Sequence, residues 1–173
     1  MNFSAIKKCD IANGTGVRTT LFVSGCRNHC EGCFQPETWN FNNGKEFTKE
    51  TEKEIIESLS PDYIQGLTLL GGDPFEEENQ EGLVTFIETV KDTYPQKDIW
   101  AYTGYLLEDL TANGKKYTEY TERMLNCIDV LVDGPFIQAE KDLRIKFRGS
   151  RNQRLIDMNE YRKTGNIMTL FGS

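Results

Sequence analysis

Cys26, Cys30 and Cys33 are three of the five cysteines in this 173-residue chain. Thiolates bind zinc and the irons of iron–sulfur clusters. A structural zinc site takes four ligands, often from two Cys-x-x-Cys pairs, whereas the run Cys-x-x-x-Cys-x-x-Cys supplies three. Three thiolates on one tight loop can hold three irons of a 4Fe–4S cubane and leave the fourth iron open to a substrate. The spacing therefore favours an iron–sulfur cluster with one open coordination position.

Two other uses of these thiols remain open on spacing alone. A zinc ion could take its fourth ligand from His29, Cys9 or Cys127, and the cluster could be purely structural. A disulfide is disfavoured, because the first twenty residues resemble no export signal and a reducing cytoplasm keeps thiols free. We therefore expect a cytoplasmic protein whose clustered cysteines are ligands.

Four short apolar runs each lead into a turn that contains glycine. They are LFV (Leu21–Val23), LTLL (Leu67–Leu70), IWAY (Ile99–Tyr102) and VLV (Val130–Val132). Continuous apolar runs are typical of strands buried on both faces of a parallel sheet. Right-handed crossovers between such strands place the following turns, SGC, GGDP, TGY and DGPF, at one end of the sheet. We expect these four turns to share one rim.

Apolar residues at helical spacing lie between and after these runs. They are Ile55, Ile56 and Leu59; Leu83, Phe86, Ile87, Val90 and Tyr94; and Tyr117, Tyr120 and Met124. Thr48 is a candidate N-cap for the first helix, and Pro95 ends the second. The alternation predicts an α/β fold, and the chain is too short for an eight-unit barrel. We expect a partial, open (β/α) barrel of mostly parallel strands, with an N-terminal hairpin that turns at Asn13–Gly16.

The composition indicates an ordinary globular protein. Hydrophobic residues make up 38% of the chain and charged residues 27%, and the length suggests a single domain over residues 1–173. The net charge of −7 disfavours nucleic acid or an anionic membrane as the main partner. No apolar stretch is long enough to span a bilayer.

The cysteine spacing resembles that of the radical S-adenosylmethionine (SAM) superfamily, in which the amino and carboxylate groups of SAM chelate the open iron. Phe34, directly after the last cysteine, matches the aromatic that packs near the adenine in that superfamily. LGGDPF (Leu70–Phe75) matches its Gly-Gly-acidic element, although Leu70 stands where a small serine is more usual. Glycines there allow close approach of the backbone to a ligand.

A longer set of motifs resembles the activating proteins of anaerobic ribonucleoside-triphosphate reductases. The motifs are NGTGVRTTLFVSGC, GCFQPETWNF, LLGGDPF, KDIWAYTGY, IDVLVDGPF and FRGSRNQR. The resemblance covers about Asp10 to Arg154, and residues 155–173 look like a variable tail. It implies an enzyme that reductively cleaves SAM and abstracts a hydrogen atom to install a glycyl radical on the reductase. It also implies an electron donor such as reduced flavodoxin.

The resemblance further implies a set of site residues. The predicted metal ligands are Cys26, Cys30 and Cys33, and the predicted cofactor contacts are Gly32, Cys33, Phe34, Gly71, Gly72, Asp73, Thr103 and Asp133. No side chain is assigned as catalytic, because the cofactors carry the radical chemistry. Two alternatives stay open: an activating enzyme of another glycyl-radical enzyme, of the pyruvate formate-lyase type, and a small non-enzymatic iron–sulfur or zinc-binding protein.

Overall fold

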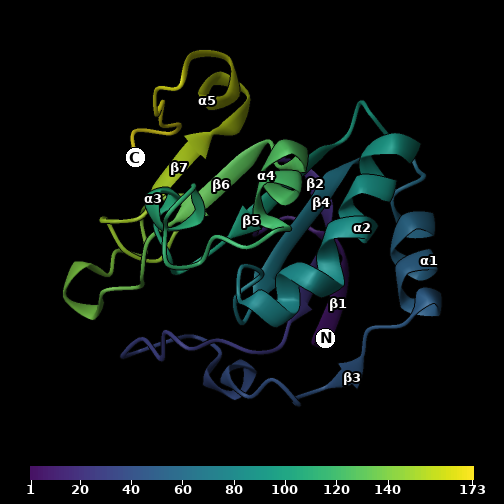
Figure 1. Cartoon of the computed structure of the whole chain (residues 1–173), viewed down its shortest axis with the longest axis horizontal. Helices are drawn as coiled ribbons and strands as arrows, with labels where there is room; N and C mark the ends of the chain where they lie inside the picture. The colour runs from purple at the N-terminus through teal and green to yellow at the C-terminus, as the bar shows by residue number, and fades with distance from the viewer.

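The computed structural model, which describes residues 1–173, is built on an open seven-stranded β-sheet (Figure 1). The strands are β1 (Asn2–Asp10), β2 (Val17–Val23), β3 (Lys45–Glu46), β4 (Ile64–Gly71), β5 (Asp98–Tyr102), β6 (Val130–Asp133) and β7 (Arg154–Asp157). Their order is β3-β1-β2-β4-β5-β6-β7. The pairs β2–β4, β4–β5 and β5–β6 are parallel, and the outer pairs are antiparallel. The predicted α/β fold with mostly parallel central strands is confirmed, and the sheet is not closed.

The four apolar runs occupy the four central strands, as predicted. The N-terminal hairpin is also confirmed, because β1 and β2 pair antiparallel across the loop that contains Asn13. Gly14 and Gly16 both have positive φ in this loop, at 126° and 71°. Residues that carry a side chain rarely adopt such backbone angles, so the two glycines allow the chain to reverse there.

Two of the three predicted helices are present, one with the predicted N-cap and the other with the predicted stop. Helix α1 (Lys49–Ser58) begins at Thr48, whose side chain accepts a hydrogen bond from the Thr51 backbone N–H, as the N-cap prediction requires. Helix α2 (Glu77–Thr93) carries its apolar stripe into the core and ends just before Pro95. The shorter helical segments are η1 (Pro36–Trp39), α3 (Leu107–Leu110), η2 (Gln138–Glu140) and α5 (Met158–Thr164).

The helix expected from Tyr117 begins later than predicted. Helix α4 spans Thr121–Cys127, so Tyr117 and Tyr120 precede it. The Thr118 backbone N–H donates instead to the Thr121 hydroxyl, and both threonine hydroxyls donate to Gln80 Oε1 on α2. These side-chain bonds favour a turn over a further helical turn.

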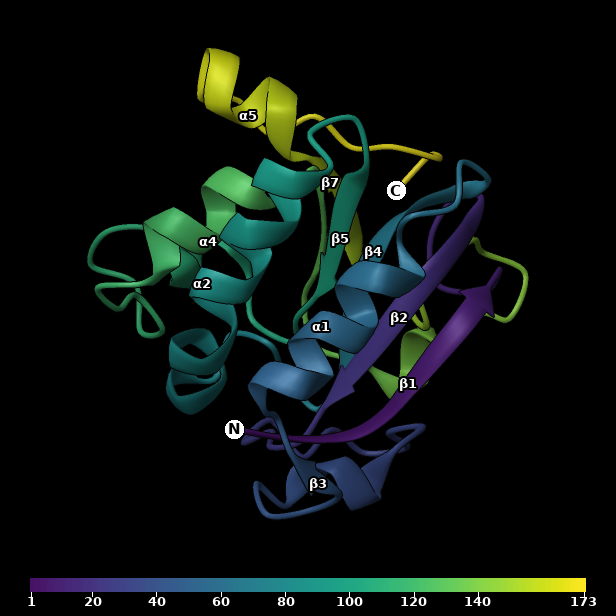
Figure 2. The same ribbon diagram turned by 90° about the vertical axis from the view of Figure 1, so that its right-hand side faces the viewer.

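Helices α1, α2 and α4 lie on the same face of the sheet (Figure 2). The main core, which includes Leu69, Ile87 and Ala101, fills the space between the helices and this face. Trp100 belongs to a smaller cluster on the other face, where the Phe147 ring packs against it at 5.3 Å between centroids. This second face, free of helices, is where a ligand-binding cavity can form.

The segment taken as a variable tail contributes to the sheet and the core. Strand β7 pairs antiparallel with β6, and Leu155, Ile156 and Met158 are fully buried. No sequence pattern predicted this strand.

No helix is both long enough and apolar enough to cross a membrane.

Candidate cluster and cofactor site

A cavity of about 720 Å³ opens where the parallel strands end. Its walls come from the turns after β2, β4, β5 and β6, so the predicted shared rim is confirmed. The predicted site residues that line it are Cys26, Cys30, Cys33, Phe34, Gly71, Gly72, Asp73 and Thr103. Gly32 and Asp133 do not line it.

The cysteine-bearing loop is closed on itself by backbone hydrogen bonds. Gly25 N–H donates to the Thr38 carbonyl at 2.6 Å, and Cys26 N–H donates to the Trp39 carbonyl at 3.2 Å. Cys33 N–H donates to the Cys30 carbonyl, which forms a tight turn with Gly32 at φ 76°. The loop therefore holds its three thiols at one side of the cavity.

The three thiols are the donor type that both iron–sulfur clusters and zinc take. All are free and half-buried, and they do not converge with other ligating side chains around one point. A cubane places each thiolate on a different iron, so such convergence is not needed. Burial, and then the Asp73 carboxylate, raise the pKa of Cys26 to about 12, and burial raises that of Cys30. A metal or cluster that binds through these two thiols would therefore release their protons.

The Gly-Gly-Asp turn is joined to the cysteine loop through the backbone. Gly72 N–H donates to the Val23 carbonyl at 2.7 Å, and Asp73 N–H donates to the Gly25 carbonyl at 2.8 Å. A Cβ at position 72 would lie 2.5 Å from the Gly25 carbonyl oxygen. Glycine at position 72 is therefore required for the two turns to meet.

The Asp73 carboxylate joins three turns of the rim. It accepts hydrogen bonds from the Thr103 hydroxyl at 2.8 Å, from Gly104 N–H at 2.8 Å and from Asn28 Nδ2 at 3.3 Å. Burial raises the pKa of Asp73 to about 7, although these donors favour the charged form. In this conformation the carboxylate holds the turns of the rim together, and its predicted cofactor contact stays a prediction.

Replacing Thr103 by valine is expected to destabilise the cluster-free protein in a pH-dependent way. Asp73 is charged well above its pKa of about 7, and the variant then removes a donor to a buried charge. We expect a loss of about 1–2 kcal/mol at pH 9 and less at pH 5, where Asp73 is protonated. Urea unfolding of both proteins at the two pH values measures this. An equal loss at both would contradict a charged Asp73 as the acceptor.

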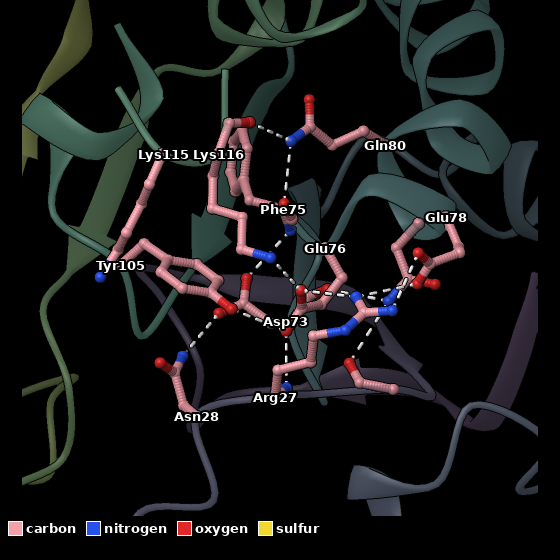
Figure 3. Close-up of polar contacts among 12 residues, drawn as sticks. Arg27, Asn28, Asp73, Phe75, Glu76, Glu78, Gln80, Tyr105, Lys115 and Lys116 are labelled. Atoms are coloured by element: carbon pink, nitrogen blue, oxygen red, sulfur yellow. Dashed lines mark hydrogen bonds and ion pairs between the residues drawn. The ribbon is translucent and has the colours of Figure 1, made fainter. Parts of the chain in front are cut away.

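Charged and polar groups around the buried carboxylate of Glu76 connect the cysteine loop to the start of α2 (Figure 3). Glu76 accepts from the Arg27 backbone N–H at 2.6 Å, from Lys116 Nζ at 2.8 Å and from the Tyr105 hydroxyl at 2.8 Å. Burial opposes the charge, but these donors outweigh it and lower the Glu76 pKa. Arg27 follows the first predicted ligand directly, so Glu76 positions that ligand. Glu76 was not among the predicted site residues, because it belongs to none of the sequence motifs.

Comparisons with known proteins give a family model and several named relatives. The family model described as "4Fe-4S single cluster domain" matches residues 12–156. Similar curated proteins, each named "Anaerobic ribonucleoside-triphosphate reductase-activating protein", come from phage T4, Haemophilus influenzae and Escherichia coli K12. The phage protein is 47% identical over 157 residues, covering 90% of this chain and 93% of its own. The two bacterial proteins are 44% and 41% identical, each covering 88% of this chain and 96% of their own.

This chain belongs to the family of anaerobic ribonucleoside-triphosphate reductase-activating proteins. The matched residues 12–156 include every predicted site residue, also the two that do not line the cavity. Asp133 is fully buried and accepts from Arg154 Nε at 2.9 Å and from Leu107 N–H at 2.8 Å. It therefore joins β6 to β7 and α3 here, and its predicted cofactor contact stays a prediction. Gly32 stays a predicted contact too.

The basic residues Arg148, Arg151 and Arg154 make separate contacts. Arg154 pairs with Asp133 and Glu108, and Arg148 donates to the carbonyls of Arg151 and Gln153. The Nη1 atom of Arg151 lies 4.0 Å from the Oδ2 atom of Asp142. Arg148 is the one of the three arginines that lines the cavity.

Proposed function

We propose that this chain activates an anaerobic ribonucleoside-triphosphate reductase by reductive cleavage of SAM and hydrogen abstraction from one glycine of the reductase. Bound at this site, a 4Fe–4S cluster would supply the electron that breaks a carbon–sulfur bond of SAM. The proposal includes a radical SAM-type partial barrel over a single domain, residues 1–173, and an electron donor such as reduced flavodoxin.

The residues of the rim suit these ligands in their chemistry. Cys26, Cys30 and Cys33 would hold the cluster, and the open iron would face the cavity. Gly71 and Gly72 expose backbone at the same wall, because they have no side chains. Their carbonyls can accept hydrogen bonds from the SAM ammonium group. Phe34 is 62% exposed beside the third cysteine, so its ring is available to an adenine.

The observation that carries the proposal is the meeting of three free thiols and a glycine-lined wall in one cavity. The thiols are the donors that iron–sulfur clusters take. At Gly71 and Gly72 the cavity wall consists of backbone alone. The names of the relatives indicate the partner, the anaerobic reductase.

The proposal is tested by anaerobic reconstitution of the protein with iron and sulfide, chemical reduction and addition of SAM. We expect 5′-deoxyadenosine and methionine in equal amounts. Addition of the reductase should then give a glycyl-radical signal in electron spin resonance. A filled cluster that yields no 5′-deoxyadenosine would rule out SAM cleavage. A glycyl signal on pyruvate formate-lyase alone would assign the chain to the other activating enzymes.

A further inference from the structure

Three of the most exposed large apolar side chains surround the mouth of the cavity. Leu143 is 83% exposed, Ile11 75% and Phe34 62%. Leu143 and Phe34 line the cavity, and Ile11 directly precedes Ala12, which also lines it. Apolar groups gathered at one opening, rather than scattered singly, are typical of a surface that binds another protein.

A positively charged segment forms one side of this mouth. Residues 137–151, which we call the rim strap, contain five Lys or Arg and two acidic residues. This net charge of +3 contrasts with −7 for the whole chain. Lys141, Arg144 and Lys146 are exposed, and Lys146 takes part in no ion pair. The strap thus presents positive charge beside the apolar groups.

The rim strap is held to the body of the protein. Phe147 packs between Trp100 and Phe171, with ring centroids 5.3 and 5.4 Å away. Within the strap, Asp142 N–H donates to the Gly149 carbonyl, and Lys141 forms a β-bridge with Ser150, so its two ends pair with each other. Ala12 and Asn13, which follow Ile11, line the same cavity as Leu143 and Ile145 of the strap. The charges and apolar groups therefore form one preformed surface.

We propose that this rim surface, made of Ile11, Leu143 and the exposed cations of the strap, docks an acidic face of the reductase around its target glycine. The inference rests on the proposed function. Hydrogen transfer needs the reacting atoms within about 3–3.5 Å, so the glycine must enter the cavity by its mouth. The surface at that mouth is therefore the one that the substrate protein must cover.

The test uses the double variant Ile11→Asp/Lys146→Glu. Neither residue lines the cavity, and both are exposed. We expect the Kd for the intact reductase, measured without SAM or reductant, to rise by at least about tenfold. The affinity of the wild-type protein should fall with added salt, and that of the variant should fall less steeply. SAM cleavage with a chemical reductant alone should be unchanged.

The matched control is Tyr63→Asp/Lys53→Glu. Tyr63 is 66% exposed and directly precedes β4, at the end of the strand opposite the cavity, and Lys53 is exposed on α1. This control should bind the reductase within about twofold of wild type. An equal loss in the control would mean that net charge, not the rim, sets the affinity, and would overturn the proposal.

Two further results would also overturn it. One is a rim variant that binds the reductase as wild type does. The other is a variant that keeps its affinity for the reductase but loses affinity for reduced flavodoxin, because the rim would then be the electron-donor site. Wild-type protein that binds the reductase through the rim yet cleaves no SAM would instead refute the proposed function.

Discussion

Replacing any one of Cys26, Cys30 and Cys33 by alanine is expected to abolish SAM cleavage. Each thiolate would hold a different iron, and no spare thiol lies in the cavity to replace it. We expect the rate of 5′-deoxyadenosine formation to fall by at least about a hundredfold, with loss of iron from the reconstituted protein. Iron content and the product assay measure the two effects.

The control for this series is Cys9→Ala. Cys9 is exposed on β1 and does not line the cavity, so this variant should bind iron and cleave SAM as wild type does. The three predicted ligand positions are only partly buried. The free energies of unfolding of the cluster-free variants should therefore lie within about 1 kcal/mol of the wild-type value. A Cys30→Ala protein with four irons and full activity would contradict three-cysteine ligation.

Gly72→Ala is expected to separate the two turns that build the cavity wall. The new Cβ would lie 2.5 Å from the Gly25 carbonyl oxygen and 2.9 Å from its carbonyl carbon, and both are backbone atoms. Because backbone cannot move aside as a flexible side chain can, we expect a loss of about 1–3 kcal/mol in stability. We also expect SAM binding to weaken by at least about tenfold, since the wall faces the proposed SAM site.

Gly82→Ala is the matched control, because the three atoms nearest its Cβ are Met1 side-chain atoms at the end of the chain, the closest at 2.7 Å, and none is backbone. Position 82 lies inside α2, where alanine favours the helix by up to about 1 kcal/mol over glycine. Urea unfolding and calorimetric titration with SAM compare the two variants. Unchanged SAM affinity in Gly72→Ala would refute the need for glycine in this wall.

Much of the site could be predicted from the sequence, because its parts are local. The three cysteines lie on one short loop, and the glycine turns directly follow apolar runs that form strands. Strand direction then places the Gly71–Asp73 turn and Thr103 at the same rim, even though thirty positions separate Asp73 from Thr103. A parallel sheet thus converts a sequence pattern into a shared position in space.

The missed features depend on partners far apart along the chain. Glu76 meets Arg27 at a separation of 49 residues and Lys116 at 40, and nothing near Glu76 indicates either cation. No sequence pattern indicated that Asp133 pairs with Arg154 on β7, and the predicted cofactor contact of Asp133 stays a prediction. That strand itself went unpredicted, because pairing at a sheet edge leaves little trace in a four-residue segment.

The sequence by itself determined the cysteine spacing, the strand and hairpin pattern, and the glycines at the rim, since each depends on residues only a few positions apart. Only the tertiary structure decided which buried charges pair, where α4 begins and how the rim strap presents its cations. Those outcomes depend on the geometry of the crossovers, which brings distant side chains within hydrogen-bond distance.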